Sequence, residues 1–172
     1  EDEELRRVMP VLERLISQVS VPVSIDTYKS GVARRALDAG ASMLNDIWGL
    51  KYDSALAKLA AEHNVPIVLM HNQKDTRYDD LISDVKTFLA RSVDQAVEAG
   101  VPREAIIVDP GIGFAKKPEH NLQLISRLRE LRELGYPLLV GPSRKSFIGL
   151  VLDLPVEQRI EGTAAAVAQK VK

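Results

Sequence analysis

The feature that most constrains the fold is a regular alternation of short apolar runs with stretches of helical periodicity. We predict five strands, at residues 21–26, 41–46, 66–71, 105–109 and 137–141. Helical patterns occupy about residues 1–19, 30–39, 54–64, 81–99, 119–134 and 156–171. The strands are almost unbroken apolar runs, as is typical of parallel strands that helices cover. The sequence therefore predicts an α/β fold built from repeated strand–helix units.

The number of units leaves two architectures open. Five units in 172 residues cannot close an eight-stranded barrel, which typically needs about 250 residues. The pattern thus fits either an open, doubly wound sheet or a part of a barrel. In both folds the carboxyl ends of the strands form the ligand site.

Composition excludes several classes of protein. With 45% hydrophobic residues, the chain has enough apolar side chains for the core of one globular domain. The 23 basic and 24 acidic residues give a net charge of −1, so we expect neither nucleic acid nor an anionic membrane as a partner. The chain has no cysteine, which fits a cytoplasmic location, and no apolar run approaches the roughly 20 residues that span a bilayer.

Polar side chains gather at the predicted strand ends. Asp26, Asn45 and Asp109 each end a strand, and we expect them to converge on one crevice with Ile47, Met70 and Phe114 as apolar neighbours. Two carboxylates and a carboxamide suit a flat heterocycle with adjacent N–H donors, such as a guanine-like or pterin ring. Helix capping or turn formation is the alternative role for each residue taken singly.

A metal site is the competing interpretation of these carboxylates. The sequence contains no His-x-x-x-His motif and no dense carboxylate cluster, so we expect no metal ligands in this chain. His71, at a strand end, is either a ligand or acid–base group or a structural residue. We expect His63 and His120 to lie at the surface.

Two loops add to the strand-end residues. Residues 109–114 form a glycine-containing loop, where the backbone can approach a ligand closely or simply turn. Residues 141–147 combine two cations with two hydroxyls before a segment that we expect to begin a helix. Lys145 and Ser146 would favour an anion there, although plain solvated charge is the alternative.

Five ordered motifs resemble those of one family. They are 24–29 (SIDTYK), 45–49 (NDIWG), 69–72 (LMHN), 109–114 (DPGIGF) and 143–149 (SRKSFIG). In order and spacing they are similar to the motifs of bacterial dihydropteroate synthases, which are pterin-binding enzymes. The resemblance implies a (βα)8 TIM barrel of which this chain covers approximately strands 3 to 7. It also implies that residues 1–172 form a single pterin-binding barrel domain, incomplete at both ends.

The resemblance implies a transferase of folate biosynthesis. Such an enzyme condenses 6-hydroxymethyl-7,8-dihydropterin pyrophosphate with p-aminobenzoate to give 7,8-dihydropteroate and pyrophosphate. Mg²⁺ would serve the pyrophosphate, and sulfonamides would compete as p-aminobenzoate mimics. A cytoplasmic homodimer is the expected state of the protein.

The resemblance also assigns residues. Asp26, Asn45, Asp109 and Lys145 would bind the pterin, with Ile47, Met70 and Gly141 as walls of its pocket. Phe114, Lys145 and Ser146 would receive p-aminobenzoate. Asp109, Lys145 and Asp26 would be the catalytic residues.

Two parts of the family pattern are missing from this sequence. They are the N-terminal strand motif, whose Asn is associated with magnesium, and the C-terminal Arg-x-His motif, which contacts pyrophosphate. Two alternatives therefore stay open: a methyltetrahydrofolate:corrinoid methyltransferase, and a non-catalytic pterin-binding fragment. The segment 143–147 (SRKSF) argues against the methyltransferase, because it suits a p-aminobenzoate carboxylate.

Overall fold

Four of the five predicted strands form one parallel sheet in the computed structural model, which describes residues 1–169. They are β1 (Ser24–Asp26), β2 (Met43–Asp46), β3 (Ile67–Met70) and β4 (Ile106–Asp109). The order in the sheet is β1-β2-β3-β4, so consecutive strands of the chain are neighbours. The register places Asp26 opposite Asn45, and Met70 opposite Asp109.

Helices follow the strands along the chain. The longer ones are α1 (Asp2–Ile16), α2 (Ser30–Asp38), α3 (Ala55–His63), α4 (Leu81–Glu98), α5 (Pro118–Ser126) and α8 (Ile160–Ala168). Shorter elements are α6 (Leu128–Leu131), α7 (Ser146–Leu152), η1 (Arg103–Ala105), η2 (Arg132–Leu134) and η3 (Val156–Gln158). The expected helix after Lys145 is thus present as α7. None of the helices in residues 1–169 combines the length and apolar character needed to cross a membrane.

The longest helix shows how local sequence sets these elements. Asp80 caps α4 by accepting a hydrogen bond from the Ser83 amide at 2.8 Å, which satisfies one of the free N–H groups at a helix start. Apolar residues recur every three or four positions along α4, so one stripe is buried. Gly100, with φ +97°, follows the end of the helix, where a left-handed residue is favoured.

The sheet has an outer face covered by helices and an inner face that carries the polar strand ends. Side chains of a strand alternate between the two faces. The outer set belongs to the hydrophobic core and comprises Ile25, Leu44, Ile67, Leu69, Ile106 and Val108. By the same alternation and register, the inner set includes Asp26, Asn45, Met70 and Asp109.

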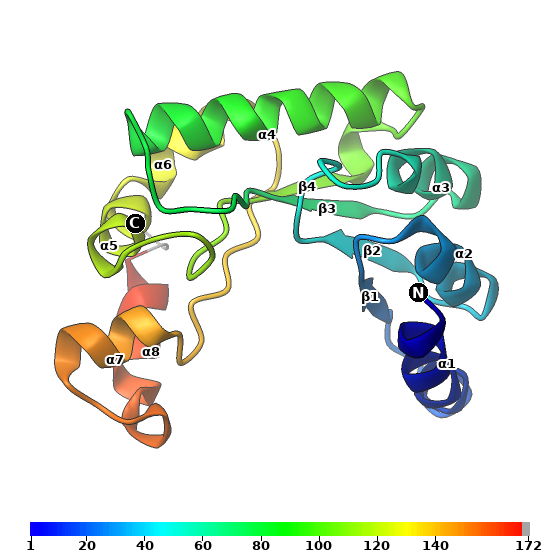
Figure 1. Cartoon of the computed structure of the whole chain (residues 1–172), viewed down its shortest axis with the longest axis horizontal. Coiled ribbons are helices and arrows are strands. Elements are labelled where there is room, and N and C mark those ends of the chain that lie inside the picture. Colours follow the sequence, from blue (N-terminus) through cyan, green and yellow to red (C-terminus); the bar gives the residue numbers. More distant parts are fainter. Residues whose placement is uncertain (170–172) are drawn as a thin grey trace.

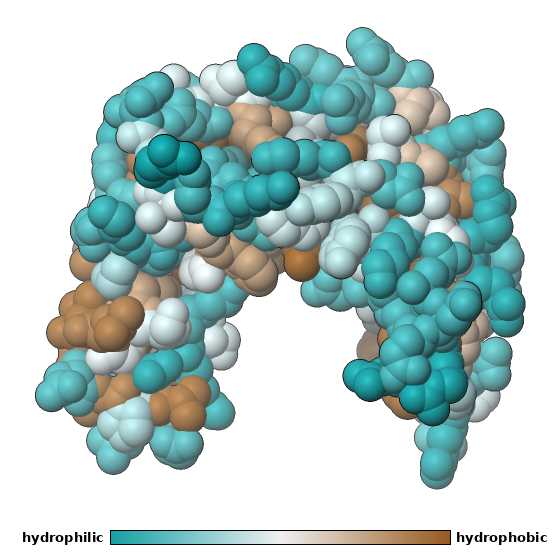
Figure 2. Space-filling view, viewed as in Figure 1, coloured by the Kyte–Doolittle hydropathy of each residue, from teal (hydrophilic) through white to brown (hydrophobic). Residues whose placement is uncertain are grey.

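The arrangement decides between the two architectures. Helices α2, α3 and α4 lie along the outer side of a curved sheet, so the chain forms an arch with α1 in one leg and α7 and α8 in the other (Figure 1). The inner side of the arch is hollow (Figure 2). A doubly wound sheet would instead carry helices on both faces and reverse its strand order. The fold is therefore part of a TIM barrel.

The prediction of a regular strand at residues 137–141 is wrong. Only Leu138 forms a bridge, parallel to Val108 of β4. Leu139 donates its amide to the Val108 carbonyl at 2.9 Å, and the Val108 amide donates to Pro137 at 3.0 Å. The segment has a described strand on one side only, and Pro137 has no N–H to extend the ladder.

The two last predicted helices are also divided. The stretch 119–134 becomes α5, α6 and η2, because Arg127 leaves the helical region at φ −113° and ψ 18°. Just before it, the Ser126 hydroxyl donates to the Gln123 carbonyl at 2.9 Å, a bond that competes with regular helix geometry. The stretch 156–171 becomes η3 and α8, and its last two residues lie outside the described part of the chain.

Candidate functional site

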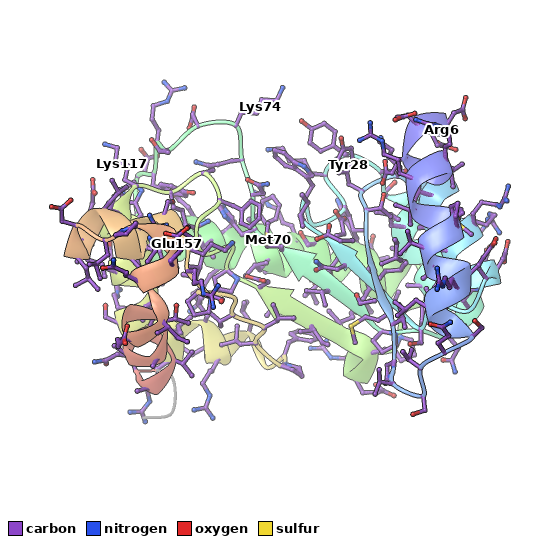
Figure 3. All side chains as sticks on the ribbon, turned by 90° about the horizontal axis from the view of Figure 1, so that it is seen from below. Arg6, Tyr28, Met70, Lys74, Lys117 and Glu157 are labelled. Atoms are coloured by element: carbon purple, nitrogen blue, oxygen red, sulfur yellow. The ribbon has the colours of Figure 1, made fainter. Side chains whose placement is uncertain are left out.

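The candidate site lies at the carboxyl ends of the strands, on the inner face of the arch. Seen from that side, Met70 lies near the centre, with the loop of Tyr28 on one side and the loop of Lys117 on the other (Figure 3). Met70 is 3% exposed, so only a small part of this predicted pocket wall is accessible. The loops that follow β1 to β4 therefore frame the site.

Asp26 and Asn45 are directly linked at one end of the site. The Asn45 side-chain amide donates a hydrogen bond to the Asp26 carboxylate at 3.2 Å. Partial desolvation raises the pKa of Asp26 and nearby Glu4 raises it further, while the Asn45 hydrogen bond lowers it. The side chain of Asp26 is nevertheless exposed toward the hollow. These two predicted residues can therefore act together on one ligand edge.

Helix α1 reinforces this end through Glu4. The Thr27 hydroxyl donates to Glu4 at 2.7 Å, and Lys29 forms an ion pair with Glu4, also at 2.7 Å. Both partners of Glu4 lie in the loop that directly follows Asp26. The contact thus fixes the loop against the first helix.

Asp46 stabilises the turn that follows β2. Its two carboxylate oxygens accept hydrogen bonds from the amides of Trp48 at 2.9 Å and Leu50 at 2.6 Å. Burial raises the pKa of Asp46, and these two bonds oppose the shift. Ile47 is partly buried within the turn that Asp46 organises.

Asp109 anchors the other end of the site. It is 7% exposed, and its carboxylate accepts a hydrogen bond from the Gly111 amide at 2.7 Å. Gly111 has φ +72°, and a Cβ at this position would overlap the carbonyl oxygen of His71. The loop after β4 can therefore lie against the end of β3 only with glycine here.

Side chains from two other segments hold this loop. The Gly113 amide donates to the Asn121 side chain at 2.6 Å, and the Tyr78 hydroxyl donates to the Ala115 carbonyl at 2.9 Å. Desolvation raises the pKa of Tyr78 to about 12, so its hydroxyl remains a donor at neutral pH. The glycine loop is thus an anchored structure.

Lys145 and Phe114 lie in contact at the Asp109 end of the site. The Lys145 ammonium group donates to the Ile112 carbonyl at 2.7 Å and lies 4.1 Å from the centre of the Phe114 ring. Desolvation lowers the pKa of Lys145, and the negative charge of Asp109 opposes that shift. The contact is a cation–π interaction, which places a cation and an aromatic face side by side.

Gly141 and Ser146 are less closely tied to this group. Both are exposed and flank Lys145 in the chain. Ser146 is the first residue of α7, and Gly141 has no atom within 4 Å of the position that a Cβ would take. They border the site rather than forming its buried part.

Lys116 is a site residue that sequence reasoning missed. Its side-chain nitrogen lies 3.0 Å from Nδ1 of His71 and donates to the Phe114 carbonyl at 3.0 Å. Desolvation lowers the pKa of Lys116 to about 7; Asp109 opposes this shift and Lys145 adds to it. Its place two residues after Phe114 was the only sequence signal, because the partial burial of a single lysine leaves no pattern in the sequence.

The three histidines differ from one another. His71 is 2% exposed, and burial followed by repulsion from Lys116 lowers its pKa to about 3, so the ring is neutral. His63 is partly buried, with Nε2 3.8 Å from Asp38, and His120 packs edge-on against Tyr78 with ring centroids 5.2 Å apart. The prediction that His63 and His120 are surface residues is therefore only partly right.

The part of the chain that the structure describes contains no metal centre built from three protein side chains. In residues 1–169, no group of three or more His, Asp or Glu side chains could hold a metal ion.

A cavity of about 720 Å³ lies away from the inner face, between α5, α6 and residues 136–140. None of the predicted site residues lines it, so the inner face of the arch remains the candidate site.

Comparison with known proteins finds relatives of this chain and solved structures of similar fold. The chain is 56% identical to dihydropteroate synthase of Bacillus subtilis (strain 168) over 167 residues, which is 97% of this chain and 59% of that protein. A structure of dihydropteroate synthase from Clostridium difficile, in the presence of pteroic acid, matches with a TM-score of 0.95 and 45% identity. That match covers 99% of this chain and 65% of the other.

Two structures of dihydropteroate synthase from Thermus thermophilus also match. The complex with 6HMPPP has a TM-score of 0.91 and 46% identity, and covers 98% of this chain and 67% of that one. The complex with 4-aminobenzoate has a TM-score of 0.92 and 44% identity, and the match covers 98% of this chain and 68% of that one. This chain thus spans about three fifths of the length of the curated relatives that it matches. The family model described as "Pterin binding enzyme" matches residues 1–172, and the chain belongs to that family.

Proposed function

We propose that this chain provides the pterin and p-aminobenzoate sites of a dihydropteroate synthase. The reaction condenses 6-hydroxymethyl-7,8-dihydropterin pyrophosphate with p-aminobenzoate and releases pyrophosphate. The observation that carries the proposal is the placement of Asp26, Asn45 and Asp109 on one inner face, with Lys145 over the Phe114 ring at the Asp109 end. Support comes from relatives solved with pteroic acid, 6HMPPP and 4-aminobenzoate.

The pterin would lie across the inner face between the two carboxylates. Asp26 and Asn45 would meet one edge of the ring, since they already form a hydrogen-bonded pair. Asp109 would accept from ring N–H groups in addition to the Gly111 amide, because a carboxylate offers about four acceptor positions. Met70, Ile47 and Gly141 would form the walls.

p-Aminobenzoate would lie on the Lys145 side. The Phe114 ring gives its aromatic ring a flat apolar partner, and Lys145 gives its carboxylate a cation. Ser146 would add a hydroxyl at the edge of this region, where α7 begins. Sulfonamides would compete here because they present a similar aromatic amine and anionic group.

Catalysis would depend on position and charge rather than on a protein nucleophile. Departure of pyrophosphate leaves positive charge at the pterin methylene, which the amine nitrogen of p-aminobenzoate attacks. Asp109 and Asp26 would stabilise that charge, and Lys145 would hold the second substrate in line. The carbon–oxygen bond breaks, the carbon–nitrogen bond forms, and the amine loses a proton to solvent.

The same proposal includes cofactor, assembly and location. Mg²⁺ would accompany the pyrophosphate; the described residues contain no three-ligand group that fits it, so no step is assigned to the ion. We include in the proposal that residues 1–172 form part of a single pterin-binding barrel domain, and that the protein is a homodimer in the cytoplasm. The family resemblance supports these points.

The test is dihydropteroate formation from the pterin pyrophosphate and p-aminobenzoate with Mg²⁺. We would compare the chain with a version extended by the parts of the B. subtilis relative that it does not cover. In the active version, Asp109→Asn should lower kcat/KM about 100-fold or more, and exposed Asp26→Asn about tenfold. Asp94→Asn, on the exposed side of α4, is the matched control and should change nothing.

Two outcomes would contradict the proposal. If the extended version binds a pterin without forming product, the chain is a non-catalytic pterin-binding module. If it transfers a methyl group from methyltetrahydrofolate to a corrinoid, the methyltransferase alternative replaces the synthase.

A further inference from the structure

A partly buried lysine links the loops after β3 and β4, at one end of the candidate site. Lys116 is within hydrogen-bonding distance of two atoms from different segments, His71 Nδ1 after β3 and the Phe114 carbonyl in the loop after β4. Because the pKa of His71 is lowered to about 3, the ring is neutral and Nδ1 can accept from the lysine. A lysine ammonium group held partly out of solvent usually has hydrogen-bond partners, as Lys116 has here.

The lysine adds to contacts that bring this loop against the sheet. Asp109 and His71 are already joined by a 2.8 Å hydrogen bond between their backbones, and Gly111 lies directly against the His71 carbonyl. At the other end of the same loop, Lys116 contacts the His71 ring. Phe114, between these two anchors, is thereby held under the Lys145 ammonium group.

The charge of Lys116 also reaches the ligand region. The titratable groups facing or neighbouring it are His71, Asp109, Lys145 and Tyr78, with His120 behind the Tyr78 ring. The pKa of Tyr78 is raised to about 12, so Tyr78 is neutral near pH 7, as is His71. The cationic form of Lys116 therefore adds positive charge beside Lys145 with one opposing carboxylate, Asp109.

We propose that Lys116 is a positioning residue for the carboxylate-bearing aromatic substrate. It ties the 110–117 loop to the end of β3, and its cationic form strengthens the attraction that Lys145 exerts on the ligand carboxylate. The inference rests on the proposed function, because p-aminobenzoate is the ligand that this region would hold. Lys116 acts through Phe114 and Lys145 and touches no substrate itself.

Equilibrium binding of p-aminobenzoate between pH 6 and 8.5 tests the inference. Wild-type affinity should fall severalfold as pH rises through about 7, because Lys116 loses its charge in that range. Lys116→Met should bind about tenfold more weakly at pH 6, the loss expected for a hydrogen bond from a charged group, with no step near pH 7. Lys117→Met removes an exposed neighbouring charge and should behave like wild type.

A second variant separates the tether from the charge. Lys116→Gln retains N–H donors for the Phe114 carbonyl, so it should bind like wild type at pH 8.5 but show no pH step. Circular dichroism would show whether Lys116→Met folds. If it does not fold, the binding measurements on Lys116→Gln test the inference on their own. A His120→Gln variant should keep the step, which excludes that histidine as its source.

The inference is overturned if Lys116→Met and Lys116→Gln keep the wild-type affinity and pH step, or if wild type shows no step. It is also overturned if the wild-type chain does not bind p-aminobenzoate. Binding with the expected step but without dihydropteroate formation would leave the inference standing and reject the proposed function alone.

Discussion

The two ends of the candidate site contain similar polar residues in opposite environments. At the β1–β2 end, Asp26 is exposed on the hollow face and pairs with Asn45. At the β3–β4 end, His71 and Asp109 are buried at 2% and 7% exposure, and His71 Nδ1 lies 3.0 Å from the Lys116 amine. At this buried end the pKa of Lys116 falls to about 7 and that of His71 to about 3.

The difference shows that burial, more than residue type, sets the properties of strand-end groups. At the exposed end, solvent screens the charges of Asp26, Glu4 and Lys29, so a single contact among them changes little. At the buried end, desolvation shifts pKa values, and each group depends on its neighbours. Changes at the β3–β4 end should therefore have larger effects than changes at the β1–β2 end.

The largest effect should follow from closing the space at Gly111. Gly111→Ala adds a Cβ that overlaps the His71 carbonyl at a positive φ, and should lower the free energy of unfolding by about 2–4 kcal/mol. Gly135→Ala is the matched control, since Gly135 has φ +78° but no atom within 4 Å of the Cβ position. It should cost about 1 kcal/mol in urea unfolding. Equal losses would show that backbone strain alone, and not close packing at the buried end, limits Gly111.

A smaller effect should appear in the pH dependence of stability. The folded-state pKa of His71, about 3, is below its ordinary value of 6.5, so unfolding takes up a proton between these values. Stability from neutral His71 is complete above pH 6.5 and is lost as pH falls toward 3. By pH 5 the loss should be about 2 kcal/mol.

Urea unfolding at pH 7 and pH 5 measures this effect. His71→Gln should remove that part of the pH dependence, while His63→Gln, at a partly exposed position, should retain it. If His71→Gln keeps the full wild-type pH dependence, burial of His71 is not its source.

The smallest effect should come from the ion pair at the exposed end. Lys29→Met removes the partner of Glu4 at 2.7 Å, but both side chains remain accessible to solvent and salt. We expect a smaller loss of stability than for Gly135→Ala, and a loss that shrinks further at high salt. A loss as large as that of Gly111→Ala, measured in the same unfolding experiment, would break the contrast between the two ends.

Much of the fold could be predicted from periodicity, and the misses have specific causes. The strands ending at Asp26, Asp46 and Asp109 were found because buried parallel strands are apolar and end at polar residues. The 137–141 segment looks the same in sequence, but a strand also needs partners, and Leu138 finds one only in β4. The break at Arg127 was missed because the buried stripe of Leu124, Leu128 and Leu131 continues across it.

The sequence by itself determined the alternation of strands and helices, the polar residues at strand ends and the family motifs. These properties are local, since they depend on spacing along the chain. Tertiary structure decided that the sheet curves with its helices on the outer side, that Asp46 holds a turn, and that Lys116 lies partly buried beside His71. Such properties depend on which segments pack together and exclude water. His71 and Lys116 are 45 positions apart in the chain, so no local sequence pattern predicts their contact.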